Sequence, residues 1–164
     1  MRLRFVLKDV MHPFVMEING LPLHVLVVHA AVVLTPLAGL AAVAYALVPK
    51  WRDWLRWPLA VAVVIAVPAV WVAFLSGGDF RESERFATAT GEFADKLEKH
   101  EDLGGILRWV ASGFGIVALL AVWLHDRTGA TRVVLAGAVA VLGLATIVVT
   151  VMTGDAGAQS VWGT

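Results

Sequence analysis

Residues 21–48, LPLHVLVVHAAVVLTPLAGLAAVAYALV, open a segment that occurs twice in this chain. An ungapped shift of 76 positions lays residues 21–79 on residues 97–155. The polar matches are His24 with His100, Arg56 with Arg132, Gly78 with Gly154 and Asp79 with Asp155. Matches between Ala, Val or Leu carry little weight in a chain that is 59% hydrophobic, but these polar matches share one register. Self-similarity at a fixed period indicates a repeated structural unit, so we predict a duplicated helical hairpin.

The composition is typical of a membrane protein. Only 16% of the 164 residues are charged, against about 25% in soluble proteins, and the mean hydropathy is +0.80. The formal net charge is zero, which leaves no basic surface for nucleic acid. The chain has no cysteine, so disulfides, thiolate metal sites, cysteine-held iron–sulfur clusters and covalently attached c-type haem are excluded.

Four apolar runs predict the fold. They cover about 23–48, 57–75, 103–124 and 133–152, and a helix of about 20 apolar residues crosses a bilayer. We predict an all-α integral membrane protein, a four-helix transmembrane bundle built from two tandem helical hairpins. A pseudo-two-fold axis along the membrane normal is expected to relate the hairpins.

The predicted domain boundaries follow from the repeat. An N-terminal tail covers 1–20, and the membrane domain covers 21–162 with the hairpin repeats 21–79 and 97–155. Ser76–Asp79 and Thr153–Asp155 are expected to end the second and fourth helices, because glycine commonly follows a helix end. The polar segment 80–103 is expected to become helical before it enters the third membrane helix.

The basic residues suggest an orientation. Four spans put both termini on one side of the membrane and the two short turns on the other. The turns carry Lys50, Arg52, Arg56, Arg127 and Arg132, and short loops rich in Lys and Arg stay in the cytoplasm. We therefore expect a multi-pass protein of the bacterial cell (inner) membrane with extracytoplasmic termini.

Four ionisable residues should meet near the extracytoplasmic face. His24, Asp79, His100 and Asp155 come from the same end of four different helices. Either His24 faces His100 across the axis, or each histidine lies beside the aspartate of its own hairpin. Opposed histidines are what b-type haem needs as axial ligands. In this interpretation Asp79 and Asp155 accept hydrogen bonds from the outer ring N–H groups of the histidines.

Two alternatives use the same residues. All four side chains could bind a divalent metal ion such as zinc, because two histidines and two carboxylates match its ligands. They could also bind no cofactor and serve only as hydrogen-bonded links between helix ends. His29 is a secondary cofactor-binding residue, because Gly104 and Gly105 leave room beside it for a flat group such as a quinone ring.

Other functional classes are not favoured. The sequence contains no nucleophile–base arrangement, phosphate-binding glycine loop or charge-lined pore, so an enzyme is the less favoured interpretation. A transporter is disfavoured because we find no charge buried in mid-membrane. The functions that we favour are therefore electron transfer or an accessory role in a membrane complex.

Three motifs resemble a known family. They are Asn19-Gly20-Leu21-Pro22-Leu23-His24 with His29 following, His100-Glu101-Asp102-Leu103-Gly104, and Gly154-Asp155-Ala156-Gly157-Ala158. Over about 17–162 the chain resembles the bacterial membrane family called domain of unknown function 2231, in its actinobacterial branch. Other branches carry histidine at the position of Asp155. Family members are often joined to Rieske or cytochrome modules, which implies electron transfer with a redox protein. The alternative is a non-catalytic accessory subunit of a larger membrane complex.

Overall fold

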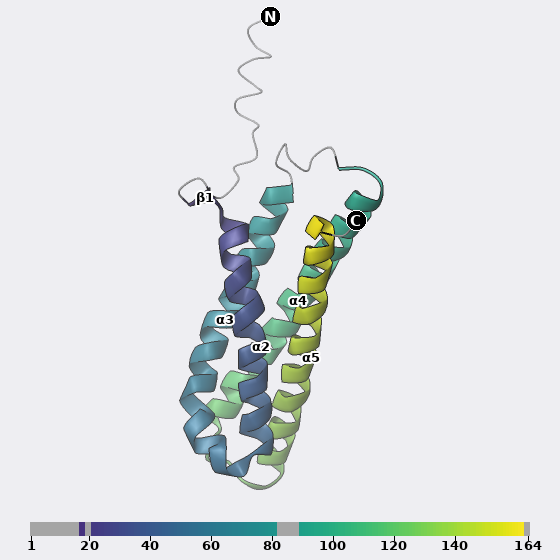
Figure 1. Ribbon diagram of the computed structural model, residues 1–164. Helices are drawn as coiled ribbons and strands as arrows, with labels where there is room; N and C mark the ends of the chain where they lie inside the picture. The colour runs from purple at the N-terminus through teal and green to yellow at the C-terminus, as the bar shows by residue number, and fades with distance from the viewer. Residues whose placement is uncertain (1–16, 19–20, 82–88, 163–164) are drawn as a thin grey trace, which may run out of the picture.

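The computed structural model describes residues 17–18, 21–81 and 89–162, and it consists almost entirely of four long helices (Figure 1). These are α2 (Leu23–Leu47), α3 (Arg52–Arg81), α4 (Glu92–Trp123) and α5 (Gly129–Trp162). The short 3-10 helix η1 (Pro49–Trp51) lies in the first turn, and β1 (Glu17–Ile18) pairs antiparallel with β2 (Leu21–Pro22). Most of the predicted tail 1–20 lies outside the described residues.

All four helices are long and apolar enough to cross a membrane, which confirms the predicted fold class. In Figure 1, α2 begins and α5 ends at one end of the bundle, and both short turns lie at the other. Within each hairpin the two helices pack against each other, and α2 also packs on α5 and α3 on α4. The helices therefore form a closed ring.

Two predicted helix ends are wrong. The helix α3 continues through Ser76-Gly77-Gly78-Asp79 to Arg81, and α5 continues through Gly154 and Asp155 to Trp162. A glycine in a helix interior costs about 1 kcal/mol relative to alanine, and packing can offset that cost. At Gly77 and at Gly157 the reason is visible, because each glycine lies against a histidine ring.

The burial pattern repeats with two different periods. The buried residues of α2 recur on α4 76 residues later, as Ala38 and Phe114 or Gly39 and Gly115 do. Those of α3 recur on α5 80 residues later, as Leu59 and Val139 or Ala73 and Thr153 do. The shift of 76 residues therefore superposes the burial pattern of α2 on that of α4. The burial pattern of α3 needs a shift four residues longer to match that of α5. By burial, Asp79 is not equivalent to Asp155.

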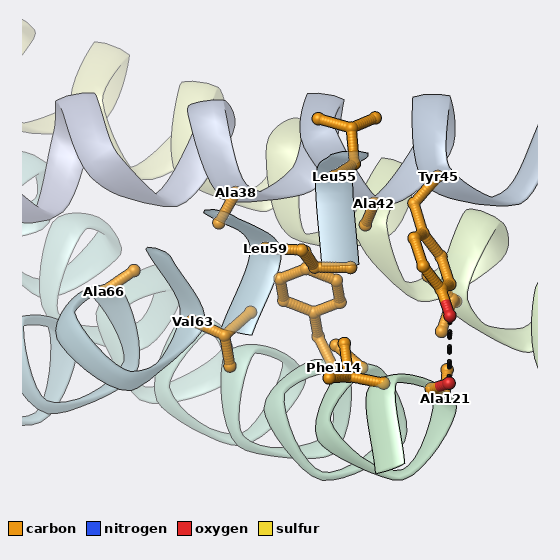
Figure 2. Packing of buried hydrophobic residues seen from close by; sticks show 12 residues of the cluster. Ala38, Ala42, Tyr45, Leu55, Leu59, Val63, Ala66, Phe114 and Ala121 are labelled. Carbon is orange, nitrogen blue, oxygen red and sulfur yellow. Dashed lines mark hydrogen bonds between the residues drawn. The ribbon is translucent and has the colours of Figure 1, made fainter. Parts of the chain in front are cut away.

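The larger of the two buried apolar clusters lies toward the turns. Figure 2 shows Leu59, Val63 and Phe114 packed beneath the small residues Ala38 and Ala42 of α2. Small residues let membrane helices approach closely. A close approach joins α2 to α5, where a β-carbon on Gly39 would lie 2.8 Å from the carbonyl oxygen of Gly143.

A polar network closes the turn end of the bundle. The hydroxyl of Tyr45 lies 3.0 Å from the carbonyl oxygen of Ala121 (Figure 2) and 3.0 Å from Nδ1 of His125. Nε2 of the buried His125 lies 2.9 Å from Oδ1 of Asp53. The network joins one residue of each turn region to the core, so it links the two hairpins.

Replacing Tyr45 with Phe should lower the free energy of unfolding by about 0.5–1.5 kcal/mol. The change removes the hydroxyl that contacts Ala121 and His125 and keeps the ring. Unfolding of the purified protein in detergent measures this change in the free energy of unfolding. Trp54→Phe, at a residue that is 74% exposed, is the control and should leave stability unchanged. A Tyr45→Phe protein as stable as the wild type would contradict the proposed link.

Candidate functional site

The two repeat-related histidines meet at the end of the bundle opposite the turns. His24 comes from the first turn of α2 and His100 from α4. Their ring centroids are 6.3 Å apart, and the ring planes are 79° to each other. Because α2 and α4 are diagonal neighbours in the ring of helices, the side chains meet across its centre. Of the two expected arrangements, the histidines adopt the one in which they face each other.

Each imidazole is fixed by a backbone carbonyl of its own hairpin. Nδ1 of His24 lies 2.8 Å from the carbonyl oxygen of Ala73 on α3, and Nδ1 of His100 lies 2.9 Å from that of Thr153 on α5. A carbonyl only accepts, so Nδ1 carries the proton and donates in both rings. In the neutral ring the lone pair is then on Nε2, which is the usual arrangement of a metal-binding histidine.

Two glycines provide the space that the rings occupy. A β-carbon on Gly77 would lie 3.0 Å from Nδ1 of His24, and one on Gly157 would lie 2.9 Å from Cε1 of His100. Each glycine is four residues after the carbonyl that accepts from the same ring, so both lie on one helix face. Sequence reasoning placed Gly77 in a helix stop and Gly157 beyond one, and it missed this role.

An apolar cavity of about 560 Å³ adjoins the histidine pair. Its walls include Val28, Val70, Phe74, Leu97 and Leu107. The few polar side chains lining it include His24, His29, His100, Glu101, Arg81 and Thr153. A pocket of this size and character suits a small organic ligand or cofactor, since such pockets span about 300–1,000 Å³.

The cavity reaches the surface mainly between α2 and α5. Most of its exposed lining residues lie on these helices, among them Val25 and Val33 of α2 and Val161 of α5. Figure 1 shows α2 and α5 drawing apart toward this end, away from their contact at Gly39 and Gly143.

The two sides of the bundle differ at the position of Phe74. Between α3 and α4, the ring of Phe74 covers Gly104 and Gly105, at 3.6 and 3.8 Å from their β-carbon positions. The residue of α5 equivalent to Phe74 in the burial register is Gly154, and a β-carbon there would have no neighbour within 4 Å. Phe74 therefore closes one side, and Gly154 leaves the other open.

Asp155 does not take the position expected of it, and the role of Asp79 stays a prediction. Asp155 is exposed and accepts a hydrogen bond of 2.6 Å from Nε2 of Gln159, while Asp79 is partly buried. The Nδ1 contacts expected from these carboxylates are made by the carbonyls of Ala73 and Thr153. The cause is the longer helix, because α5 continues past Asp155 and keeps it on an exposed face.

His29 lines the same cavity as this histidine pair, and the predicted metal site includes both histidines. Nδ1 of His29 lies 2.7 Å from the carbonyl oxygen of Val25, and its exposed ring lines the cavity. Within the residues that the structure describes, no group of three or more His, Cys, Asp or Glu side chains could hold a metal ion. The four-residue metal site stays a prediction, of which the structure brings together the two histidines.

One residue in the membrane helices was missed. Arg108 is a charged residue inside the third apolar run, five residues after Leu103, and it was not singled out from the sequence. The signal was present in the sequence, because Arg108 is the only charge between Leu103 and Leu124. Its guanidinium lies 4.0 Å from the ring centroid of Phe74.

Comparison with known proteins identifies the family. A family model described as a predicted membrane protein, domain of unknown function 2231 (DUF2231), matches residues 20–164. The chain belongs to this family. The match includes both hairpins and both histidines, and it confirms the family resemblance of the motifs. None of the curated proteins and none of the solved structures matches the chain.

Alanine substitutions at four glycines of this DUF2231 protein should separate the space-making glycines from ordinary ones. Gly77→Ala and Gly157→Ala should lower stability, because the new methyl group displaces a histidine ring from its carbonyl. Gly78→Ala and Gly154→Ala, which meet nothing within 4 Å, should raise stability by up to about 1 kcal/mol, since alanine is the better helix former. Unfolding in detergent gives the sign. The same sign for all four variants would contradict the steric role of Gly77 and Gly157.

Proposed function

We propose that this membrane protein binds one b-type haem between His24 and His100 and serves electron transfer. The observation that carries the proposal is the spacing of the two rings. A histidine nitrogen lies about 2 Å from a metal it binds, and a ring nitrogen is about 1 Å from the ring centre, so two rings on opposite sides of one metal have centres about 6 Å apart. The observed separation is 6.3 Å.

The tautomers support the same assignment. Because Nδ1 of each ring donates to a carbonyl, Nε2 has the lone pair that an axial ligand needs. The carbonyls also fix the ring orientations and raise the basicity of the ligands. When bound, haem would supply a one-electron couple, whose potential the axial histidines and the surrounding apolar side chains tune.

The cavity supports the size and polarity of this ligand. Its volume of about 560 Å³ lies within the range of cofactor pockets, and its walls are mostly apolar side chains. Arg81 and Glu101 form an ion pair at its rim and join α3 to α4. This combination of apolar walls and two convergent histidines resembles cofactor sites in the cores of helix bundles.

The proposed location follows from charge. The turns carry Lys50, Arg52, Arg56, Arg127 and Arg132, and we assign them to the cytoplasm because short basic loops stay there. The histidines then lie near the extracytoplasmic face of the bacterial cell membrane. A redox protein or a larger membrane complex at that face would be the electron-transfer partner.

Two other functions use some of the same contacts. The bonds from His24 to Ala73 and from His100 to Thr153 join the helices of each hairpin without a cofactor, which favours a non-catalytic accessory subunit as the second candidate. A divalent ion such as zinc is the third, and it would have to complete its coordination with ligands beyond the two histidines.

An absorption spectrum of the purified protein tests the haem proposal. Protein isolated from cells supplied with haem precursor should show a Soret band that sharpens on reduction. His24→Ala and His100→Ala should each abolish the six-coordinate low-spin spectrum, since each removes one axial ligand. His29→Ala is the control and should keep the spectrum. A colourless wild-type protein that also fails to take up added haem would overturn the proposal and favour the accessory role.

Filling the open side of the cavity provides a second test. Gly154→Phe should repeat on α5 what Phe74 does on α3, and so should reduce haem uptake at least tenfold while leaving both histidines in place. Gly137→Phe is the matched control, because Gly137 lies on the same helix, nearer the turns, and also has no atom within 4 Å of its β-carbon position. Equal haem content in both variants would mean that the cavity is not the binding site.

A further inference from the structure

Arg108 is the one charge in an otherwise apolar stretch of α4. The run from Leu103 to Trp123 contains no other Asp, Glu, Lys or Arg, and Arg108 is five residues, or about 7.5 Å, inside it. A charge at this depth is costly unless its side chain reaches polar surroundings or a partner. Such residues in membrane helices are functional candidates by default.

Three aromatic rings surround the guanidinium. Its carbon lies 4.0 Å from the ring centroid of Phe74, 5.3 Å from that of Trp71 and 5.4 Å from that of Trp109. The two tryptophans make an edge contact with centroids 5.4 Å apart. Nε1 of Trp71 donates to Oγ of Ser112 at 2.9 Å, and this hydroxyl donates to the carbonyl oxygen of Arg108 at 2.7 Å. The rings are therefore held in place around the cation.

The guanidinium lacks an anionic partner within the described part of the chain. Its buried Nε has no hydrogen-bond acceptor there, and no carboxylate there forms an ion pair with it. Glu101, two turns earlier on α4, is already paired with Arg81. Aromatic faces attract the charge but do not satisfy a guanidinium's five N–H donors. A ligand with oxygen acceptors and negative charge would do so.

The position along α4 indicates which anion is available. Phe74 contacts the β-carbon positions of Gly104 and Gly105, so the guanidinium above its ring lies near the start of the apolar run. The side chain thus extends toward the membrane surface, as long basic side chains in membrane helices do. Lipid phosphate groups lie at that level, and tryptophans are enriched there.

We infer that Arg108, Trp71 and Trp109 form a binding site for the phosphate group of an anionic phospholipid, where α3 packs against α4. The planar guanidinium matches two phosphate oxygens at once. Trp109 is 62% exposed and provides an apolar surface for the upper acyl chain. The site occurs once per chain, because the positions equivalent to Arg108, Trp109 and Trp71 are Val32, Val33 and Val151.

Native mass spectrometry of delipidated protein tests this site. The wild type should bind one phosphatidylglycerol before it binds phosphatidylcholine, and excess inorganic phosphate should not displace the lipid. Arg108→Gln should weaken phosphatidylglycerol binding about five- to tenfold, the loss expected for one basic residue at the membrane surface. Arg127→Gln, at an exposed turn residue, is the control and should bind as the wild type does.

Each other result would overturn the assignment. Unchanged phosphatidylglycerol binding by Arg108→Gln would show that Arg108 is not the site. Equal wild-type affinity for phosphatidylcholine would remove the preference for an anionic headgroup, and displacement by inorganic phosphate would make the ligand a free anion. If Arg108→Gln does not fold, Arg108→Lys provides the comparison. It keeps the charge and loses the two-pronged geometry, so it should bind more weakly than the wild type.

Discussion

The backbones of α2 and α5 touch at Gly39 and Gly143, and the arrangement of the bundle depends on this contact. A side chain at Gly39 would overlap Ile147 and the carbonyl of Gly143, so only glycine permits the observed distance. From this point the helices separate toward one end and stay together toward the other. The tight end encloses the core around Tyr45, Leu59 and Phe114, and the separated end holds the cavity.

The bundle thus combines a closely packed end, near the turns, with an end that contains a cavity. In a membrane, helices gain little from apolar burial against each other, so close packing and interhelical hydrogen bonds hold them together. The turn end has both, in its small residues and in the contacts of Tyr45, His125 and Asp53. At the other end, the histidine–carbonyl contacts replace part of the packing that the cavity removes.

Much of this architecture could be predicted from the amino-acid sequence. The long apolar runs indicated four membrane helices, since few other structures satisfy backbone polar groups in lipid. The match of His24 with His100 predicted that these two residues meet, and they do, because both face the centre of the bundle. Helix ends were harder. Glycine can end a helix or make room inside one, and only the ring beside Gly77 or Gly157 shows which applies.

The repeat register was ambiguous for a geometric reason. A shift of four residues is close to one helical turn and rotates a helix by only about 40°, so two registers present nearly the same apolar face. Polar matches such as Asp79 with Asp155 favoured the shorter period, whereas the packing of α3 and α5 follows the longer one. Arg108 gave no signal in the repeat for a related reason, because its counterpart 76 residues earlier is the apolar Val32.

The difference between Phe74 and Gly154 has a consequence for how this protein meets its neighbours. Two identical hairpins around an axis would offer the bilayer two equivalent sides, and a partner could approach either with equal affinity. Because the Phe74 ring closes one side, the two sides of the molecule differ within the plane of the membrane. The side between α2 and α5 is open, and the side between α3 and α4 is closed. The duplication supplies two matching halves, and the exchange of Phe74 for Gly154 is one of the differences that give them different surroundings.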